Sequence, residues 1–365
     1  MQAQTVVIVG AGISGLQVAR ALLKRGQHPL VIEQGEAVGG IWTNKAYPRL
    51  GVHVPHAYYE FAEFPWPAEL LQDAGSHPSS QAVQAYVQAY AEHFGLLQHI
   101  RFRCQLLRLQ LVPQGGWAVI YLDKASGLFQ VVSADYVVMA TGMHVVPNVP
   151  VYKGMQHFRG LQLHSNDLTD PSLLAGKRVV VVGGGRSALD YAAMVTASQV
   201  AASVTWLYRQ AHWPIPQQLA PGLPAPRGGA VSADVLLYCT GYTRSYEFLD
   251  KALRARLGLQ KDGLPLFRHM LPPALPGLAF VGCEAASFNI PLTAGLQAEW
   301  LAGVLAGAVG LPPAADMQDD VRRMTAWSRR VFPPHRHRVS AVQLYSLQMQ
   351  HEYACAACVV RGAQQ

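Results

Sequence analysis

Three glycines at fixed spacing follow a short apolar run near the start of the chain, in the segment TVVIVGAGISGLQ at 5–17. Gly10, Gly12 and Gly15 form the pattern GxGxxG. In this pattern the first glycine permits a tight turn, the second lets backbone approach a pyrophosphate, and the third lets a helix pack closely on a strand. The phosphates then lie at the positive end of the helix dipole. The chemistry that this spacing predicts is the binding of a dinucleotide.

The elements needed to position these glycines surround them in the sequence. The run at 5–9 is apolar and rich in β-branched residues, as expected of a strand buried in a parallel sheet. LQVARALLKRG then has helical periodicity and ends at Gly26, and a second strand, PLVIE, ends in Glu33. A carboxylate about 20 residues past the glycines accepts hydrogen bonds from a ribose. The context therefore supports a nucleotide with a free ribose diol, such as FAD.

A second turn of the same kind follows at 178–190, in RVVVVGGGRSALD. Its pattern is GxGxxA, and the residues that we expect to contact a nucleotide are Gly183, Gly185, Arg186, Ser187 and Ala188. The next strand, SVTWLY, leads into Arg209 instead of an acid. An arginine binds a 2′-phosphate through paired, charge-assisted hydrogen bonds, whereas a carboxylate would repel it. The second turn therefore favours NADPH, although Arg209 could also be a solvated charge at a strand end.

The segments between the turns predict how each domain is completed. Residues 100–140 contain four strand patterns, RFRCQLLRLQLV, WAVIYL, LFQVV and DYVVMATG, which indicate a β-meander that returns to a parallel strand. That strand ends at Thr141 and Gly142, and DVLLYCTGY repeats the same ending at Thr240 and Gly241. Two nucleotide domains, each closed by a strand ending in Thr-Gly, are the layout of flavoprotein oxidoreductases that bind two dinucleotides.

Several motifs in the same order resemble the flavin-containing monooxygenases that use FAD and NADPH. They are GAGISGL, VIEQGEAVGGIW, FRGLQLHSNDL with Phe158, Gly160 and His164 in register, GGGRSALD, WLYRQAHWPIP, LYCTGY and FNIPLTAGLQAEW. The resemblance implies further cofactor-binding residues at Ser14, Gln34, Gly40, Ile41, Trp42, His53 and Gln297. It also implies that NADPH reduces FAD, that O₂ adds at flavin C(4a), and that the hydroperoxide transfers one oxygen atom to a small amine, sulfide, oxime or 2-oxo acid.

The segment from Tyr47 to Pro67 resembles the flavin-facing loop of this family, and LGVHVP is closer to its plant YUCCA-type branch. His53 stands where many members have Asn, and it is our candidate catalytic residue. It either hydrogen-bonds the flavin or its hydroperoxide, or it is a structural histidine of the loop. The aromatic residues that follow favour core packing over a substrate cage: Tyr58, Tyr59, Phe61, Phe64 and Trp66. His164 is expected at a hinge, in a cofactor-orienting role or as a plain linker residue.

Two features depart from the family pattern. Leu168-Thr169 replaces an aromatic residue and its polar neighbour, which disfavours a Baeyer–Villiger enzyme. The interval at 217–232, QQLAPGLPAPRGGAVS, is rich in Pro and Gly and too short for the meander that the first domain has. We therefore expect an α/β fold of two Rossmann-like dinucleotide-binding domains, in which the FAD domain is discontinuous and the inserted NADPH domain is shortened. The predicted parts are 1–160 for FAD, 161–237 for NADPH, and 238–365 for the rest of the FAD domain and the C-terminal helices.

Composition limits the class of protein and its partners. The 365 residues suit about two domains, 50% are hydrophobic and 14% are charged. The net charge of +7 is scattered, so we expect a small-molecule substrate and O₂ as partners, with no nucleic acid and no membrane. LAGVLAGAVGL at 301–311 is too short to span a bilayer and the start carries no signal-peptide pattern, so a cytoplasmic protein is expected, and a homo-oligomer is possible.

The cysteines and two alternative functions complete the predictions. Cys355 and Cys358 form a CxxC, but no βαβ unit surrounds them and no second CxxC is present, so we favour two small residues on one face of a terminal helix over a redox or zinc site. His335 and His337 are likewise interpreted as part of a solvated basic loop. No metal site is predicted. One alternative is a pyridine-nucleotide disulfide reductase, which needs a CxxC against its flavin. The other is a flavin-binding scaffold without catalysis.

Overall fold

A computed structural model describes residues 4–47, 50–74, 76–144, 146–168, 170–208, 231–260, 262–284 and 289–331. The chain divides into two compact units. Unit 1 comprises Met1–Asn44, Gly51–Met143 and Tyr246–Gln365, and unit 2 comprises Lys45–Leu50 and His144–Ser245. Unit 1 is thus discontinuous in sequence, with unit 2 inserted between its segments. The inserted part of unit 2, His144–Ser245, is longer at both ends than the predicted range of 161–237. Which nucleotide each unit binds remains a prediction.

A five-stranded parallel sheet forms the centre of unit 1, in the order β14-β7-β1-β2-β3. The strands are β1 (Val6–Val9), β2 (Leu30–Ile32), β3 (Ile100–Arg101), β7 (Tyr136–Met139) and β14 (Leu278–Phe280). Every residue of β1 is buried, which fits an uninterrupted VVIV run in the middle of a sheet covered on both faces. β1 lies between β2 and β7, so its carboxyl end lies at the middle of the edge where all these parallel strands end.

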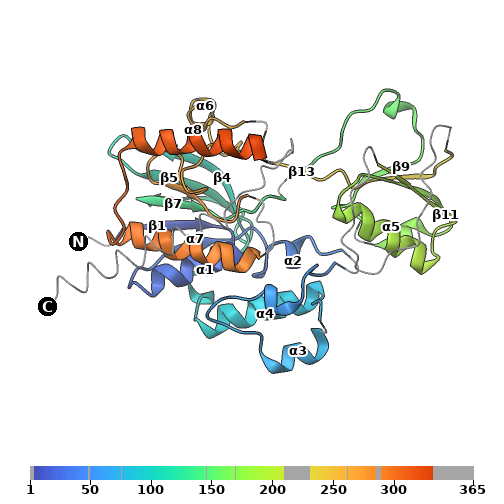
Figure 1. The fold of residues 1–365 in the computed structure, drawn as a ribbon, viewed down its shortest axis with the longest axis horizontal. Coiled ribbons are helices and arrows are strands. Elements are labelled where there is room, and N and C mark those ends of the chain that lie inside the picture. The colour runs from blue at the N-terminus through green and yellow to red at the C-terminus, as the bar shows by residue number, and fades with distance from the viewer. Residues whose placement is uncertain are drawn as a thin grey trace. The chain divides into compact units, whose positions relative to one another are not determined.

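Two packed helices lie on one side of this sheet, and a third lies beyond its other side (Figure 1), where side chains from residues 104–134 pack directly on the sheet. The helices are α1 (Ile13–Leu23), α7 (Ile290–Leu305) and α8 (Ala314–Val331). α1 packs on α7, and Figure 1 shows α8 on the opposite side of the sheet from this pair. Glu299 of α7 holds α1 through Arg20 (3.1 Å) and Arg25 (2.8 Å). α8 buries Val321, Thr325 and Ser328, a helical spacing typical of one covered face.

The predicted meander is present in unit 1 as an antiparallel sheet in the order β4-β5-β6. Its strands are β4 (Cys104–Leu111), β5 (Trp117–Asp123) and β6 (Leu128–Ala134). The first pattern, RFRCQLLRLQLV, is divided between two sheets, because Arg103 has φ of 59° and turns the chain from β3 into β4. The remaining helices of unit 1 are α2 (Ile41–Asn44), η1 (His56–Tyr58), α3 (Ala68–Ala74), α4 (Ser80–His93), η2 (Leu97–His99) and α6 (Lys251–Leu257).

Unit 2 repeats the parallel plan on a smaller scale, with the order β11-β10-β12-β9. Its main elements are β9 (Leu161–His164), β10 (Arg178–Val182), α5 (Arg186–Ser198), β11 (Ser203–Leu207) and β12 (Val235–Tyr238). Outside this sheet, β8 (Val146–Pro147) pairs with β13 (Tyr242–Thr243), and η3 (Met155–His157) and η4 (Pro171–Leu174) are single turns. The predicted α/β class with two parallel sheets is confirmed. Of the interval at 217–232, only residues 231 and 232 lie within the described part.

The closest backbone approach at the first turn predicts which glycine the fold requires. A Cβ at Gly15 would lie 1.9 Å from the carbonyl oxygen of Gly10. Gly15→Ala must therefore push α1 away from β1, and overpacking of this kind costs about 1–3 kcal/mol. That cost outweighs the helix-propensity gain of about 0.5–1 kcal/mol that alanine brings. We expect a lower free energy of unfolding in chemical denaturation.

The matched control for this substitution is Gly310→Ala. A Cβ at Gly310 meets no atom within 4 Å, so its free energy of unfolding should stay within about 0.5 kcal/mol of the parent chain. Equal stability of the Gly15 and Gly310 variants would contradict the close packing of α1 on β1.

Candidate functional site

The first glycine-rich turn joins β1 to α1. Gly10 has φ of 107°, and its N–H donates to the carbonyl of Ile32 at 2.8 Å, which holds the turn at the ends of β1 and β2. Gly12 is the N-cap of α1 and has no side chain to cap the helix. A Cβ at Gly12 would lie 3.7 Å from the Cα of Gly40, an ordinary contact. The first turn of α1 therefore presents backbone N–H groups at the carboxyl edge of the sheet, where an anion is stabilised.

Glu33 is buried at the end of β2, as the sequence predicted, with an exposed fraction of 5%. Its Oε2 accepts the N–H of Ala11 at 2.8 Å, and its Oε1 accepts the N–H of Gly35 at 2.7 Å. Oε1 also accepts from Asn44 Nδ2 at 3.5 Å, and because a carboxylate oxygen has two lone pairs, Oε2 retains capacity for another donor. This carboxylate ties the turn to β2 and suits the hydroxyl groups of a ribose, so the residues present fit the dinucleotide that the sequence predicts.

The GGIW segment lies directly beside this turn. Gly39 donates to the carbonyl of Ala11 at 3.1 Å, and a Cβ at Gly40 would lie 3.3 Å from the Cα of Gly12. Trp42 is buried on α2, where its Nε1 donates to the hydroxyl of Tyr59 at 3.1 Å. Burial raises the pKa of Tyr59 well above its ordinary value, so this hydroxyl stays protonated. Ile41 precedes Trp42 on the same short helix.

A glycine that sequence reasoning missed connects three elements at the turn. Gly282 follows β14, and its N–H donates to Gln297 Oε1 of α7 at 3.2 Å. A Cβ at Gly282 would collide with Ser14 of α1, so Ser14, Gln297 and Gly282 meet at one place. The signal was present in LAFVG, an apolar strand that ends in glycine as β1 does. Thr141 and Gly142 follow β7, the neighbour of β1, as predicted.

Two predicted residues near this site have a different setting. Gln34 is exposed and offers its carbonyl to Lys124 Nζ at 3.3 Å. His53 is exposed in the bend before η1, and its role in oxygen chemistry stays a prediction. The aromatic residues after it pack mainly into the core: Phe61 stacks on Tyr90 with ring centroids 3.8 Å apart, and Trp66 stacks on Tyr86 at 4.0 Å. Tyr58 differs, with 63% of its surface exposed.

The second turn has the same construction in unit 2. Gly183 has φ of 145° and donates to the carbonyl of Leu207 at 2.9 Å, while a Cβ there would collide with the carbonyl of Cys239. Gly185 is the N-cap of α5, and apart from its chain neighbours and the backbone of α5 no described residue has an atom within 4 Å of where its Cβ would be. Within the described part of the chain, the N-terminal end of α5, whose first three residues are Arg186, Ser187 and Ala188, is therefore open to a ligand. Arg209 lies outside the described residues.

Asp190 and Tyr47, neither of which the sequence singled out for this purpose, hold Arg186 at that helix end. Arg186 Nε lies 2.7 Å from Asp190 Oδ1, and the Tyr47 hydroxyl donates to Asp190 Oδ2 at 2.8 Å. The Tyr47 ring also packs on Tyr191 with centroids 4.8 Å apart. Burial, and then the charge of Asp190, raise the pKa of Tyr47, so its hydroxyl remains a donor. The segment that follows α2 is thus anchored to the second turn.

The Thr240–Gly241 ending of β12 is held through its backbone carbonyls. Asn148 donates from its backbone N to the carbonyl of Gly241 at 2.9 Å and from Nδ2 to the carbonyl of Thr240 at 3.1 Å. His164 lies 3.0 Å from the Gly241 carbonyl through Nε2, while its Nδ1 accepts the N–H of Asn166 at 3.1 Å. This pairing requires the neutral ring with its proton on Nε2. Burial lowers the pKa of His164 in agreement with that state.

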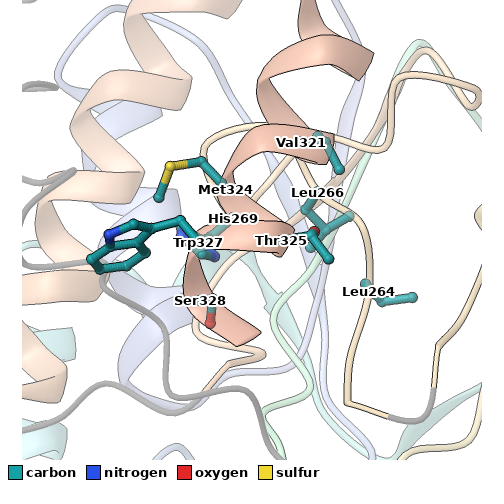
Figure 2. A pocket seen from close by; sticks show the side chains of 8 residues that line it. All are labelled: Leu264, Leu266, His269, Val321, Met324, Thr325, Trp327 and Ser328. Atoms are coloured by element: carbon teal, nitrogen blue, oxygen red, sulfur yellow. The ribbon is translucent and has the colours of Figure 1, made fainter. Parts of the chain in front are cut away.

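A small pocket that opens to solvent lies elsewhere in unit 1, between α8 and the segment 264–269 (Figure 2). Its lining consists of Leu264, Leu266, His269, Val321, Met324, Thr325, Trp327 and Ser328, none of which is a predicted site residue. The described residues contain no group of three or more side chains suited to a metal ion. No helix among them is long and apolar enough to cross a membrane.

Comparisons with known proteins agree with the two turns. Residues 3–226 and 229–354 match the family model described as flavin-binding monooxygenase-like. The chain is 28% identical over 372 residues to the flavin-containing monooxygenase FMO GS-OX3 of Arabidopsis thaliana, covering 91% of this chain and 80% of that protein. It is 30% identical over 370 residues to the FMO GS-OX-like 9 protein of the same plant, covering 88% and 79%. The S-allyl-L-cysteine S-oxygenase of Allium sativum shares the fold, with a TM-score of 0.84 and 24% identity over 96% of this chain and 89% of that one.

The open space at Gly12 predicts a substitution that separates folding from cofactor binding. Gly12 has φ of −79° and ψ of −175°, which alanine adopts without strain, and its Cβ makes no contact closer than 3.7 Å. Gly12→Ala should therefore fold with unchanged stability, yet its methyl group occupies the place expected for the pyrophosphate. We expect the purified variant to lose its bound flavin, measured as flavin absorbance per chain. Full flavin occupancy in this variant would contradict the assignment of the turn.

The state of His164 predicts a pH dependence of stability. Its folded pKa is lowered from 6.5, so just below pH 6.5 the unfolded chain binds more protons than the folded chain. The contribution of His164 is therefore present above pH 6.5 and is lost as the pH falls. His144, whose pKa is also lowered by burial, acts in the same direction. His164→Gln removes one of these protonations, so the free energy of unfolding should change less between pH 7.5 and 5.5. An unchanged pH slope would argue against a neutral buried His164.

Proposed function

This chain belongs to the flavin-binding monooxygenase-like family and is an FAD- and NADPH-dependent monooxygenase, and we propose that it oxygenates a small nucleophilic molecule. The substrate class proposed is an amine, a sulfide, an oxime or a 2-oxo acid. The observation that carries the proposal is the repeated arrangement in the two units: a parallel strand, a glycine turn and an uncapped helix end. Cytoplasmic location and a homo-oligomeric state remain predictions.

The residues of unit 1 suit the binding of FAD. The first turn of α1 offers N–H groups to the pyrophosphate, and Gly12 and Gly40 keep side chains away from it. Glu33 accepts from the ribose while it fixes the turn through Ala11. When bound and reduced, FAD supplies the chemistry that activates O₂. The contribution of the chain is to hold that group rigidly and to exclude water.

The residues of unit 2 suit the binding of NADPH. The open end of α5 at Gly185 accommodates a pyrophosphate, and Asp190 fixes Arg186 beside it. Arg209, which lies outside the described residues, is proposed to bind the 2′-phosphate. The family match breaks at residues 227 and 228, within the interval that we predict to be a shortened connection. If that connection covers the site less completely, part of the NADPH consumed should yield H₂O₂ instead of product.

The two alternatives predict different behaviour. A disulfide reductase needs two neighbouring cysteines, whereas the cysteines of the described residues, Cys104, Cys239 and Cys283, are buried and lie far apart in the sequence. Cys355 and Cys358 lie outside the described residues. A non-catalytic scaffold would bind flavin without NADPH-dependent reduction. Neither alternative is favoured by a specific observation in the two units.

The experiment that tests the proposed function is product analysis with isotope-labelled oxygen. The purified flavoprotein is incubated with NADPH, ¹⁸O₂ and a panel of amines, sulfides, oximes and 2-oxo acids, with NADPH and H₂O₂ measured in parallel. We expect one labelled oxygen atom in the product of at least one class. NADPH oxidation that requires a disulfide acceptor, with no label in any product, would indicate the reductase. No NADPH oxidation at all would indicate the scaffold.

The proposed phosphate contact of Arg209 predicts a cofactor preference. A hydrogen bond to a charged group contributes about 1.5–3 kcal/mol, which corresponds to roughly ten- to a hundredfold in affinity. Arg209→Ala should raise the KM for NADPH by that factor and leave the KM for NADH nearly unchanged. Arg108→Ala, which removes an exposed arginine of β4 in unit 1, is the control for the loss of one charge. A parent chain that uses NADH and NADPH equally well would remove the basis for this assignment.

A further inference from the structure

Arg244 of unit 2 is an arginine with two guanidinium nitrogens that lack a hydrogen-bond partner among the described residues. It follows β13 directly, and its Nε and Nη2 are buried without a hydrogen-bond partner among the described residues. A buried donor left without an acceptor costs about 1–3 kcal/mol, and more when the group is charged. An oxyanion supplied by a ligand would offset it.

The same two nitrogens bind carboxylates elsewhere in this chain. Arg178 places Nε 3.0 Å and Nη2 2.7 Å from the two oxygens of Asp234. Arg329 places Nε and Nη2 each 3.0 Å from the oxygens of Asp262. These two nitrogens form one planar edge of the guanidinium, which matches the two oxygens of a carboxylate. The edge that Arg244 leaves unused is therefore the one suited to bidentate recognition of an oxyanion.

The strand order places Arg244 on one side of the second turn. β11 and β12 lie on opposite sides of β10, and Arg244 follows β12 through the Thr240–Gly241 turn. Arg244 is partly buried, whereas Thr243 before it is exposed. Two residues before Arg244, Tyr242 contacts the rings of His144 and His164, each with centroids 5.1 Å away. Arg244 thus directly follows a segment that packs on the polar residues beyond β12.

We propose that Arg244 binds the carboxylate of the substrate. This inference rests on the proposed function, which assigns the phosphates of NADPH to the end of α5 after β10 and to Arg209 after β11. The described part of that site, the end of α5, follows β10, whereas Arg244 follows the neighbouring strand β12. The oxyanion that it accepts then belongs to a second ligand. The substrate class becomes a small nucleophile, such as a sulfide or a 2-oxo acid, that also carries a carboxylate.

The test compares two sulfides that differ only in charge, 3-(methylthio)propanoate and 3-(methylthio)propanamide. Their binding to the oxidised flavoprotein in the presence of NADP⁺ is measured by calorimetry, together with the binding of NADP⁺ itself. We expect Arg244→Gln to weaken binding of the acid about ten- to a hundredfold, and to leave the amide and NADP⁺ unchanged. Arg254→Gln, which neutralises an exposed arginine of α6, should change none of these.

Three results would overturn the proposal. Equal weakening of acid and amide would make Arg244 a structural residue. Weaker NADP⁺ binding with unchanged binding of the acid would assign Arg244 to a cofactor phosphate. A parent chain that binds the acid no better than the amide would exclude a carboxylate site. If Arg244→Gln does not fold, judged by its flavin content, Arg244→Lys is used instead. Lysine keeps the charge but lacks the paired N–H groups, so binding of the acid should be weakened less than a complete loss of the site would weaken it. Because binding is measured without turnover, failure of oxygenation would leave these results interpretable.

Discussion

The approach of α1 to the end of β1 is the contact on which the rest of unit 1 depends. The space between Gly15 and the carbonyl of Gly10 admits no side chain, so the chain reverses from strand to helix within a few residues. That short reversal places the N-terminal end of α1 at the carboxyl edge of the sheet. Three other segments then reach the turn: the Glu33 carboxylate accepts the N–H of Ala11, the Gly39 N–H donates to the Ala11 carbonyl, and Gly282 packs against Ser14. A nucleotide site assembled in this way consists mostly of main chain, which explains its dependence on glycine.

Unit 2 meets the same constraint with a different set of supports. Gly183 lies against the carbonyl of Cys239, and Gly185 leaves the end of α5 open. Where unit 1 has the buried carboxylate of Glu33, unit 2 has Asp190, which binds an arginine and a tyrosine instead of the turn itself. The first site therefore places the carboxylate of Glu33 beside the expected ribose, whereas the second places the Arg186–Asp190 ion pair beside the expected phosphates. Together with Arg209, which lies outside the described residues, this difference is the reason for assigning a different nucleotide to each unit.

Features encoded locally could be predicted from the sequence, and those that depend on distant contacts could not. The two turns, Glu33, the meander and the long helix α7 follow from short patterns whose meaning does not change with context. The switch of sheets at Arg103 could not be foreseen, because a positive φ at a residue other than glycine leaves no compositional signal. The pairing of Tyr47 with Asp190 joins residues 143 positions apart. The role of Gly282 becomes visible only where α1 and α7 meet. Arg209 and most of the interval at 217–232 lie outside the described residues, so those predictions stand on the sequence.

The central claim is that two turns in one chain bind two nucleotides that exchange electrons, and anaerobic reduction of the bound flavin by NADPH tests it most directly. The parent chain is compared with Gly185→Ala, whose added methyl group meets no atom of the other described residues within 4 Å beyond its chain neighbours and α5 backbone, so we expect it to act on a ligand at the end of α5. We predict that NADPH bleaches the flavin absorbance of the parent at a rate that saturates. The variant should retain its FAD and require a much higher NADPH concentration for the same rate. A flavin that NADPH does not reduce, or a variant reduced with the same concentration dependence as the parent, would contradict the assignment of the second turn.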